Sequence, residues 1–282
     1  MTQKDIPNCF LPVTQLSEKL EKGGLSSLEL IEEYLERIRK HDPNLGAFID
    51  VYEEEAHKAA AASDMARASG HIIGPLQGIP VAVKDIIDIE GKITTGGSMV
   101  WKNRRSTLTA TLVRRMVEAG MIVLGKTHTV EFAMGSFGTN QHMGSPKNPW
   151  DLEEHRATGG SSAGTAAAVA AGLSPWGIGT DTGGSVRIPS AWCGLTGLKT
   201  SVGRISTHGV LPLSHTLDTP GPMCRSVEDA AILYRILAGP DEQDSRTVIH
   251  PVEDPFPELK KGISGFKLAR VPDSELENVD SE

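Results

Sequence analysis

The fold and chemistry of this chain are constrained most by two glycine- and serine-rich segments, which are separated by a stretch that contains an alanine run. The first covers residues 159–164 (GGSSAG) and the second covers residues 181–185 (DTGGS). Because glycine lacks a Cβ atom, such backbone approaches a ligand closely and adopts dihedral angles that other residues avoid. Several N–H groups can then converge on one developing oxyanion. The two turns predict acyl-transfer chemistry, and Ser185 is the best candidate for its nucleophile.

The size and charge of the chain exclude several classes of protein. Its 282 residues, of which 39% are hydrophobic, are enough to bury a substantial core in one large α/β domain or two smaller ones. The formal net charge of −8 disfavours binding to a phosphate backbone, so we expect no nucleic-acid partner.

The cysteines and the N-terminal residues indicate the cellular compartment. The three cysteines have no CxxC spacing and are typical of reduced cytoplasmic thiols. Residues 1–10 are too polar for a signal peptide, and no apolar run approaches the length of a membrane span. We therefore expect a soluble, cytoplasmic protein that contacts no membrane.

Hydrophobic periodicity predicts an alternation of helices and strands. The apolar spacing indicates helices, the first two forming a hairpin, over residues 14–21, 27–40, 53–69, 110–119, 162–171 and 230–238. Short apolar runs indicate strands over residues 79–83, 121–124, 176–178 and 266–271. The order of strand, helix and strand between residues 79 and 124 predicts a crossover and a partly parallel sheet. Residues 226–229 (SVED) resemble a capping box.

Two alternative interpretations of the glycine-rich turns fail on context. Residues 160–164 fit the G-x-S-x-G nucleophile elbow of α/β-hydrolases, with Ser162 as nucleophile and, for example, Asp218 and His250 as acid and base. An elbow follows a buried strand, whereas residues 151–158 are polar. Phosphate binding is the second interpretation. Neither turn has the lysine of a Walker A loop, and residues 177–182 lack the third glycine of G-x-G-x-x-G.

The third interpretation treats the two turns as one unit with a lysine as base. The first turn, the alanine-rich stretch and residues 179–191 together resemble the amidase signature family. Residues 78–85 (GIPVAVKD) and 194–199 (GLTGLK) agree with that family as well, and the resemblance extends from about Leu16 to Gly239. It implies an α/β fold with a mixed sheet flanked by helices, and an enzyme that hydrolyses carbon–nitrogen bonds of linear amides, with esters as further candidate substrates.

The resemblance also implies the roles of individual residues. Ser185 would be the nucleophile, Ser161 the proton relay and Lys84 the base, with a cis peptide bond between Gly160 and Ser161. The implied oxyanion hole consists of the backbone N–H groups of Thr182, Gly183, Gly184 and Ser185. Such a site needs no metal and no organic cofactor. A lysine acts as a base near neutral pH only where burial or a neighbouring cation lowers its pKa.

Other residues receive structural or weaker assignments. We expect Ser162 and Asp181 to hold the turns by hydrogen bonds, and Arg187 to brace the second turn through an ion pair. Residues 132–136 resemble the part of the family that lines the acyl pocket, which makes Ala133 and Met134 candidate substrate contacts. Structural or surface roles are expected for Lys126, Lys199, Cys193, His208 and His215.

The sequence leaves the biological setting open. The family includes the glutaminase-type component of tRNA-dependent amidotransferases, which releases ammonia from glutamine for a partner. That component has Ser-Ser-Thr-Glu-Asn where residues 136–140 read SFGTN. We therefore expect a stand-alone hydrolase acting on a small-molecule amide, and homodimerisation stays open.

The length of the chain raises a further alternative. We expect one amidase-signature domain over residues 1–282, with a helical region 12–70, a catalytic core 71–239 and a C-terminal segment 240–282. Family members continue beyond this length, so a truncated, non-catalytic remnant or interaction subunit is the competing expectation.

Overall fold

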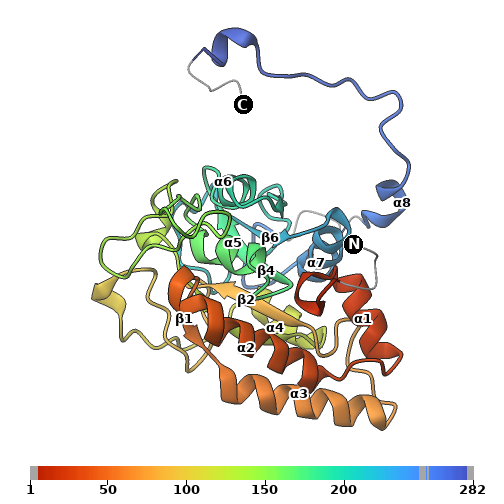
Figure 1. The fold of residues 1–282 in the computed structure, drawn as a ribbon. Coiled ribbons are helices and arrows are strands. Elements are labelled where there is room, and N and C mark those ends of the chain that lie inside the picture. Colours follow the sequence, from red (N-terminus) through yellow and green to blue (C-terminus); the bar gives the residue numbers. More distant parts are fainter. Residues whose placement is uncertain (1–5, 248–251, 253, 278–282) are drawn as a thin grey trace.

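A six-stranded mixed sheet organises the fold (Figure 1). The computed structural model describes residues 6–247, 252 and 254–277. The strand order across the sheet is β1-β3-β2-β4-β6-β5. The strands are β1 (Phe48–Val51), β2 (Pro80–Lys84), β3 (Ile122–Thr127), β4 (Trp176–Asp181), β5 (Thr196–Gly197) and β6 (Thr219–Cys224). β2 runs parallel to both β3 and β4, whereas the other pairings are antiparallel. The expected mixed sheet is thus confirmed.

Helices cover both faces of this sheet. They are α1 (Val13–Glu21), α2 (Ser27–Leu45), α3 (Glu53–Ala68), α4 (Thr111–Glu118), α5 (Ala163–Ala170), α6 (Arg187–Trp192), α7 (Val227–Leu237) and α8 (Phe256–Leu259), with short 3₁₀ turns at Asn8–Phe10, Met99–Trp101, Glu131–Ala133 and Asp273–Glu275. The step from β2 to β3 and the step from β3 to β4 run in opposite directions across the sheet. Right-handed crossovers therefore place α4 and α5 on opposite faces (Figure 1).

Helix ends follow from local sequence. Ser26 and Glu29 form a reciprocal capping box at the start of α2, and Gly46 ends that helix with φ 65°. At α7, only half of the predicted box forms: Ser226 accepts from the N–H of Asp229, while the Asp229 carboxylate accepts from the N–H of Val13. The Asp229 side chain thus ties α7 to the start of α1.

The alanine-rich helix α5 lies very close to the sheet. A Cβ atom at Gly164 would lie 2.3 Å from the Ala47 carbonyl oxygen and 2.4 Å from the His128 nitrogen. A Cβ atom at Gly177 of β4 would lie 2.5 Å from the methyl group of Thr165. Small residues on both elements permit this approach. It places the start of α5, and with it the first glycine-serine turn, beside the ends of β2 and β4.

Three expectations for the fold were wrong or incomplete. Residues 266–271 form no strand and are exposed, because no neighbouring strand pairs with them among the described residues. The region 12–70 is not purely helical, since β1 lies within it and pairs with β3. β5, β6 and α6 were not predicted; β6 contains Pro220 and Pro222, which disfavour a strand locally.

Candidate active site

Lys84 lies at the end of β2 with its side chain fully buried. Its Nζ donates to the Ser161 Oγ at 2.7 Å and to the Thr180 Oγ1 at 2.8 Å. Thr180 is near the end of β4, which pairs in parallel with β2, so the sheet brings the two residues to the same edge. No motif in the sequence marks Thr180 as a partner of the lysine.

Burial makes Lys84 an unusual lysine. Desolvation lowers its pKa from 10.5 to about 7, although the negative charges of Asp181 and Asp218 act in the opposite direction. A group with such a pKa is neutral in a large fraction of molecules at neutral pH. Lys84 can therefore accept a proton, and its hydrogen-bond partner Ser161 is the nearest source of one.

Ser161 is fixed by the backbone around it. The peptide bond between Gly160 and Ser161 is cis, as the family resemblance implied. The Gly160 N–H donates to the Ser136 carbonyl at 2.7 Å, and the Ser161 carbonyl accepts from the Val130 N–H at 3.1 Å. A Cβ atom at Gly160 would lie 2.7 Å from the Gly138 nitrogen. The first turn thus requires glycine at this position and holds the Ser161 hydroxyl inside the protein.

Asp181 organises the second turn. Its carboxylate accepts from the N–H groups of Gly184 at 2.9 Å and Val186 at 3.2 Å. The Arg187 guanidinium bonds both carboxylate oxygens, at 3.0 and 2.9 Å. Hydrogen bonds from Arg187 and from the backbone hold the pKa of Asp181 below its usual value despite its burial. Asp181 and Arg187 thus make the contacts expected of residues that brace this turn.

The two turns meet at Ser185. Its carbonyl accepts from the Ser162 N–H at 3.3 Å. Ser185 retains 9% of its exposure, whereas Lys84 and Ser161 have none. All three residues are buried, and Ser185 alone retains some exposed surface.

Ser162 makes hydrogen bonds within the fold. Its Oγ donates to the Thr180 carbonyl and accepts from the Thr180 N–H, both at 3.3 Å. No strand precedes Ser162 directly, so an elbow is not formed. Asp218, the acid of the elbow interpretation, instead accepts from the Thr182 hydroxyl. His250 lies outside the described residues.

The other lysines have fixed partners. Lys126 is as buried as Lys84, but its Nζ lies 3.2 Å from the Asp85 carboxylate and 2.8 Å from the Thr94 hydroxyl. These contacts, to a carboxylate and a hydroxyl, are structural ones. Lys199 donates to the Thr200 backbone carbonyl at 2.7 Å.

The remaining candidates lie apart from the lysine. Cys193 is buried in a small hydrophobic cluster, and burial raises its pKa to about 12. The Nδ1 of His208 is 3.4 Å from the Thr111 hydroxyl, and the carbonyl of His215 accepts from Arg246. Their contacts are those of structural residues.

The segment around Ala133 has an uncommon backbone. Phe132 and Ala133 have φ values of 48° and 61°, which are rare for residues other than glycine and occur often at functional sites. Ala133 is buried, whereas 72% of Met134 is exposed. Nearby, the exposed rings of Phe137 and Trp192 form an edge-to-face pair with centroids 5.8 Å apart. Sequence analysis did not single out this aromatic pair.

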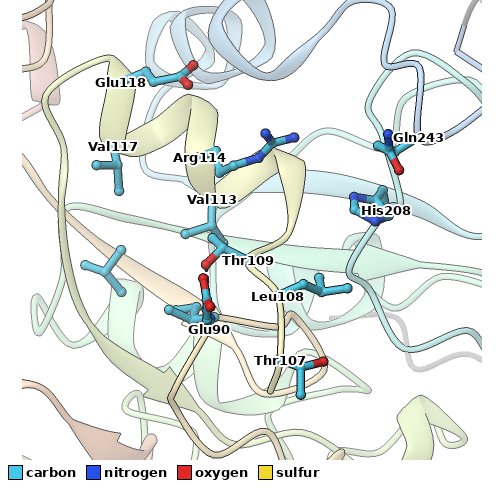
Figure 2. A pocket seen from close by; sticks show the side chains of 12 residues that line it. Glu90, Thr107, Leu108, Thr109, Val113, Arg114, Val117, Glu118, His208 and Gln243 are labelled. Atoms are coloured by element: carbon cyan, nitrogen blue, oxygen red, sulfur yellow. Dashed lines mark hydrogen bonds between the residues drawn. The ribbon is translucent and has the colours of Figure 1, made fainter. Parts of the chain in front are cut away.

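A cavity of about 680 Å³ lies away from these residues (Figure 2). Val113, Arg114 and Glu118 of α4 line it together with His208 and Gln243. Figure 2 shows His208 and Gln243 across the cavity from α4. None of the residues predicted for catalysis lines it.

Comparison with known proteins identifies the family. The family model described as Amidase matches residues 29–282. The chain belongs to the amidase family.

Among the described residues, no helix combines the length and apolar character that crossing a membrane requires.

Individual members of the amidase family are similar to this chain over nearly its whole length. The A subunit of glutamyl-tRNA(Gln) amidotransferase from Marinomonas sp. is 43% identical over 270 residues, which cover 96% of this chain and 55% of that protein. A solved structure described as a vestigial protein complex that reveals the origins of an s-triazine catabolic enzyme matches with 38% identity and a TM-score of 0.87, over 90% of this chain and 56% of that one.

Peptide amidase from Stenotrophomonas maltophilia matches with 39% identity and a TM-score of 0.80, over 86% of this chain and 50% of that one. This chain therefore spans about half the length of the amidase-family relatives that it matches.

Proposed function

We propose that this chain hydrolyses a carboxylic amide through an acyl-enzyme on Ser185, with Ser161 as proton relay and Lys84 as base. The hydrogen bond from the fully buried Lys84 Nζ to the Ser161 Oγ, at 2.7 Å, carries the proposal. A pKa of about 7 supports the role of Lys84 as a base at neutral pH. Ser185, in the second turn, is the one of the three residues that retains some exposed surface.

Acylation begins when the Ser185 Oγ attacks the amide carbon. As the new C–O bond forms, the Ser185 proton passes to Ser161, and the Ser161 proton passes to Lys84. The carbonyl electron pair moves to the oxygen, which becomes an oxyanion. The C–N bond then breaks, and the leaving nitrogen takes a proton from Ser161, which Lys84 replenishes. Water repeats the attack on the ester, so that the products are a carboxylic acid and an amine or ammonia.

Backbone N–H groups of the second turn would stabilise the oxyanion. The Gly184 N–H already donates to the Asp181 carboxylate, so we assign Gly184 to anchoring the turn. Thr182, Gly183 and Ser185 remain as proposed donors, and the described loop contacts give the N–H groups of Gly183 and Ser185 no other acceptor. Each well-placed donor contributes about 3 kcal/mol to transition-state stabilisation.

The substrate itself would lie against the segment that contains Ala133 and Met134. The left-handed backbone at Phe132 and Ala133 presents the exposed Met134 side chain to solvent. Phe137 follows Ser136, whose carbonyl accepts from the Gly160 N–H, so the aromatic pair of Phe137 and Trp192 lies near the first turn. These side chains favour an amide with an apolar group.

A fluorophosphonate probe tests this proposal, since it requires an activated serine but little substrate specificity. Peptide mapping should find one adduct, on Ser185, in the parent chain and in Lys199→Ala. The Lys84→Ala variant should lose it. An adduct on Ser162, or no adduct on folded parent protein, would contradict the proposed site.

A second candidate function is the release of ammonia from glutamine. It is favoured by the identity of 43% to a protein named as the A subunit of glutamyl-tRNA(Gln) amidotransferase. In that case the chain would act with partner subunits. Residues 136–140 (SFGTN) depart from the pattern of the amidotransferase component and favour the first candidate. Ammonia release from glutamine, compared with release from peptide amides by the same preparation, separates the two.

A further inference from the structure

Two carboxylates act on the buried Lys84, and their own surroundings differ. The Lys84 Nζ contacts Thr180 of β4, Asp181 follows Thr180, and Asp218 directly precedes Thr219 of β6, which pairs with Asp181. The negative charges of both carboxylates favour the ammonium form of Lys84. The Arg187 guanidinium compensates the charge of Asp181 through two hydrogen bonds, at 3.0 and 2.9 Å. Among the described residues Asp218 makes no ion pair: Arg246 lines the same small cavity, together with His208 and His215, but its guanidinium is bound to Asp244. Unlike the charge of Asp181, that of Asp218 is therefore not neutralised by a direct ion pair.

The Asp218 carboxylate is surrounded by neutral donors. One oxygen accepts from the Thr182 hydroxyl and from the Ser214 N–H at 3.0 Å. The other accepts from the Leu213 N–H at 2.9 Å and again from Ser214. The side chain is buried, with 7% of its surface exposed. Because each contact supplies a hydrogen to the carboxylate, the geometry fits the ionised form.

Loop structure alone does not require a charge at this position. A serine or asparagine accepts hydrogen bonds from the following or preceding backbone in many turns. Burying a carboxylate without a cation costs more free energy than burying a serine or an asparagine side chain. Catalysis supplies a use for the charge: Lys84 becomes an ammonium group when it accepts the proton, and the Asp218 charge then stabilises it.

Asp218 also contacts the second turn directly. Thr182 is the first residue of the segment that we propose as the oxyanion hole, and its hydroxyl is bound to Asp218. The same carboxylate fixes the loop at residues 213–214, just before β6. One side chain thus contacts the proposed donor segment while its charge acts on the base.

We propose that Asp218 is a positioning residue that stabilises the protonated form of Lys84 during the reaction and orders the turn at Thr182. This inference rests on the proposed function, because it assigns Lys84 the role of base. It predicts that removal of the Asp218 charge changes the pH at which the site becomes active, and not only the rate.

The test is the pH dependence of fluorophosphonate labelling of Ser185. Neutral Lys84 is the active form, so labelling should rise with pH as Lys84 loses its proton. In Asp218→Asn the ammonium form loses its stabilising charge. The pH of half-maximal labelling should therefore fall by about one unit. Thr182→Val removes the hydroxyl contact but no charge, so it should slow labelling without moving this pH.

A second neutral variant separates the effect of the lost charge from that of a folding defect. Asparagine places an NH₂ group among N–H donors, whereas the hydroxyl of Asp218→Ser can accept from them, and it should show the same shift. An unchanged midpoint in a folded neutral variant overturns the role of Asp218 and leaves the proposed function standing. If the parent chain is not labelled on Ser185 at any pH, the proposed function fails, and this inference fails with it.

Discussion

Replacement of Lys84 by methionine should abolish labelling of Ser185 and yet stabilise the protein at neutral pH. Methionine is unbranched and fits the space of a buried lysine stem, and it carries no charge to desolvate. Lys84 makes no ion pair among the described residues; its partners are the hydroxyls of Ser161 and Thr180. Its burial is therefore not offset by a direct electrostatic partner.

The magnitude follows from the pKa of the lysine. In the unfolded chain the pKa is 10.5, and in the folded protein it is about 7. Each unit corresponds to about 1.4 kcal/mol, so burying the lysine costs about 4 kcal/mol at pH 7. Methionine removes the partner of the buried Ser161 and Thr180 hydroxyls, which costs about 1 kcal/mol for each, the lower end of the range for a buried unpaired group. The net expectation is a gain of about 2 kcal/mol in the free energy of unfolding.

The pH dependence has a definite sign. Because the folded-state pKa lies below the unfolded one, the unfolded chain binds more protons between pH 7 and 10.5. The cost of burying Lys84 is complete below about pH 7 and disappears as the pH rises toward 10.5. The advantage of Lys84→Met over the parent should therefore shrink between pH 7 and pH 9.

Urea unfolding at both pH values, followed by circular dichroism, measures this difference. Lys126→Met is the matched control, since Lys126 is equally buried but paired with Asp85 at 3.2 Å. Its removal leaves a buried carboxylate without its cation and should destabilise the fold by about 3 kcal/mol. A Lys84→Met variant that is less stable than the parent at pH 7, with an unchanged m-value, would refute this reasoning.

Three further predictions are independent of that comparison. If Lys84 is the base, the rate at which a fluorophosphonate labels the parent chain should rise about fivefold from pH 6 to pH 7, with a midpoint near 7 in time-resolved mass spectrometry. Gly160→Ala should cost about 1–3 kcal/mol in urea unfolding, because its Cβ would meet backbone at 2.7 Å, whereas Gly183→Ala has open space and should leave stability unchanged. Ser26→Ala removes the capping box with Glu29 and should lower the free energy of unfolding by about 1 kcal/mol, an effect that Ser26→Asp should largely restore.

Much of this protein could be predicted from local sequence. Apolar residues at helical spacing located α1, α2 and α4, and the short apolar runs located β2, β3 and β4. The glycine-serine pattern located the two turns that the fold brings into contact at Ser162 and Ser185. Local sequence did not predict the strands whose formation depends on a neighbouring strand. β6 forms despite its two prolines because it pairs with β4. Residues 266–271 have a strand-like composition, but no strand pairs with them among the described residues.

Tertiary structure decided the electrostatics of the site. The sequence showed Lys84 and Lys126 as similar lysines at the ends of apolar runs, and both are fully buried. Only the folded chain pairs Lys126 with a carboxylate and leaves Lys84 with two hydroxyls. The reason is physical: a pKa depends on the dielectric and the charges within a few ångströms, and residues far apart in the chain supply both.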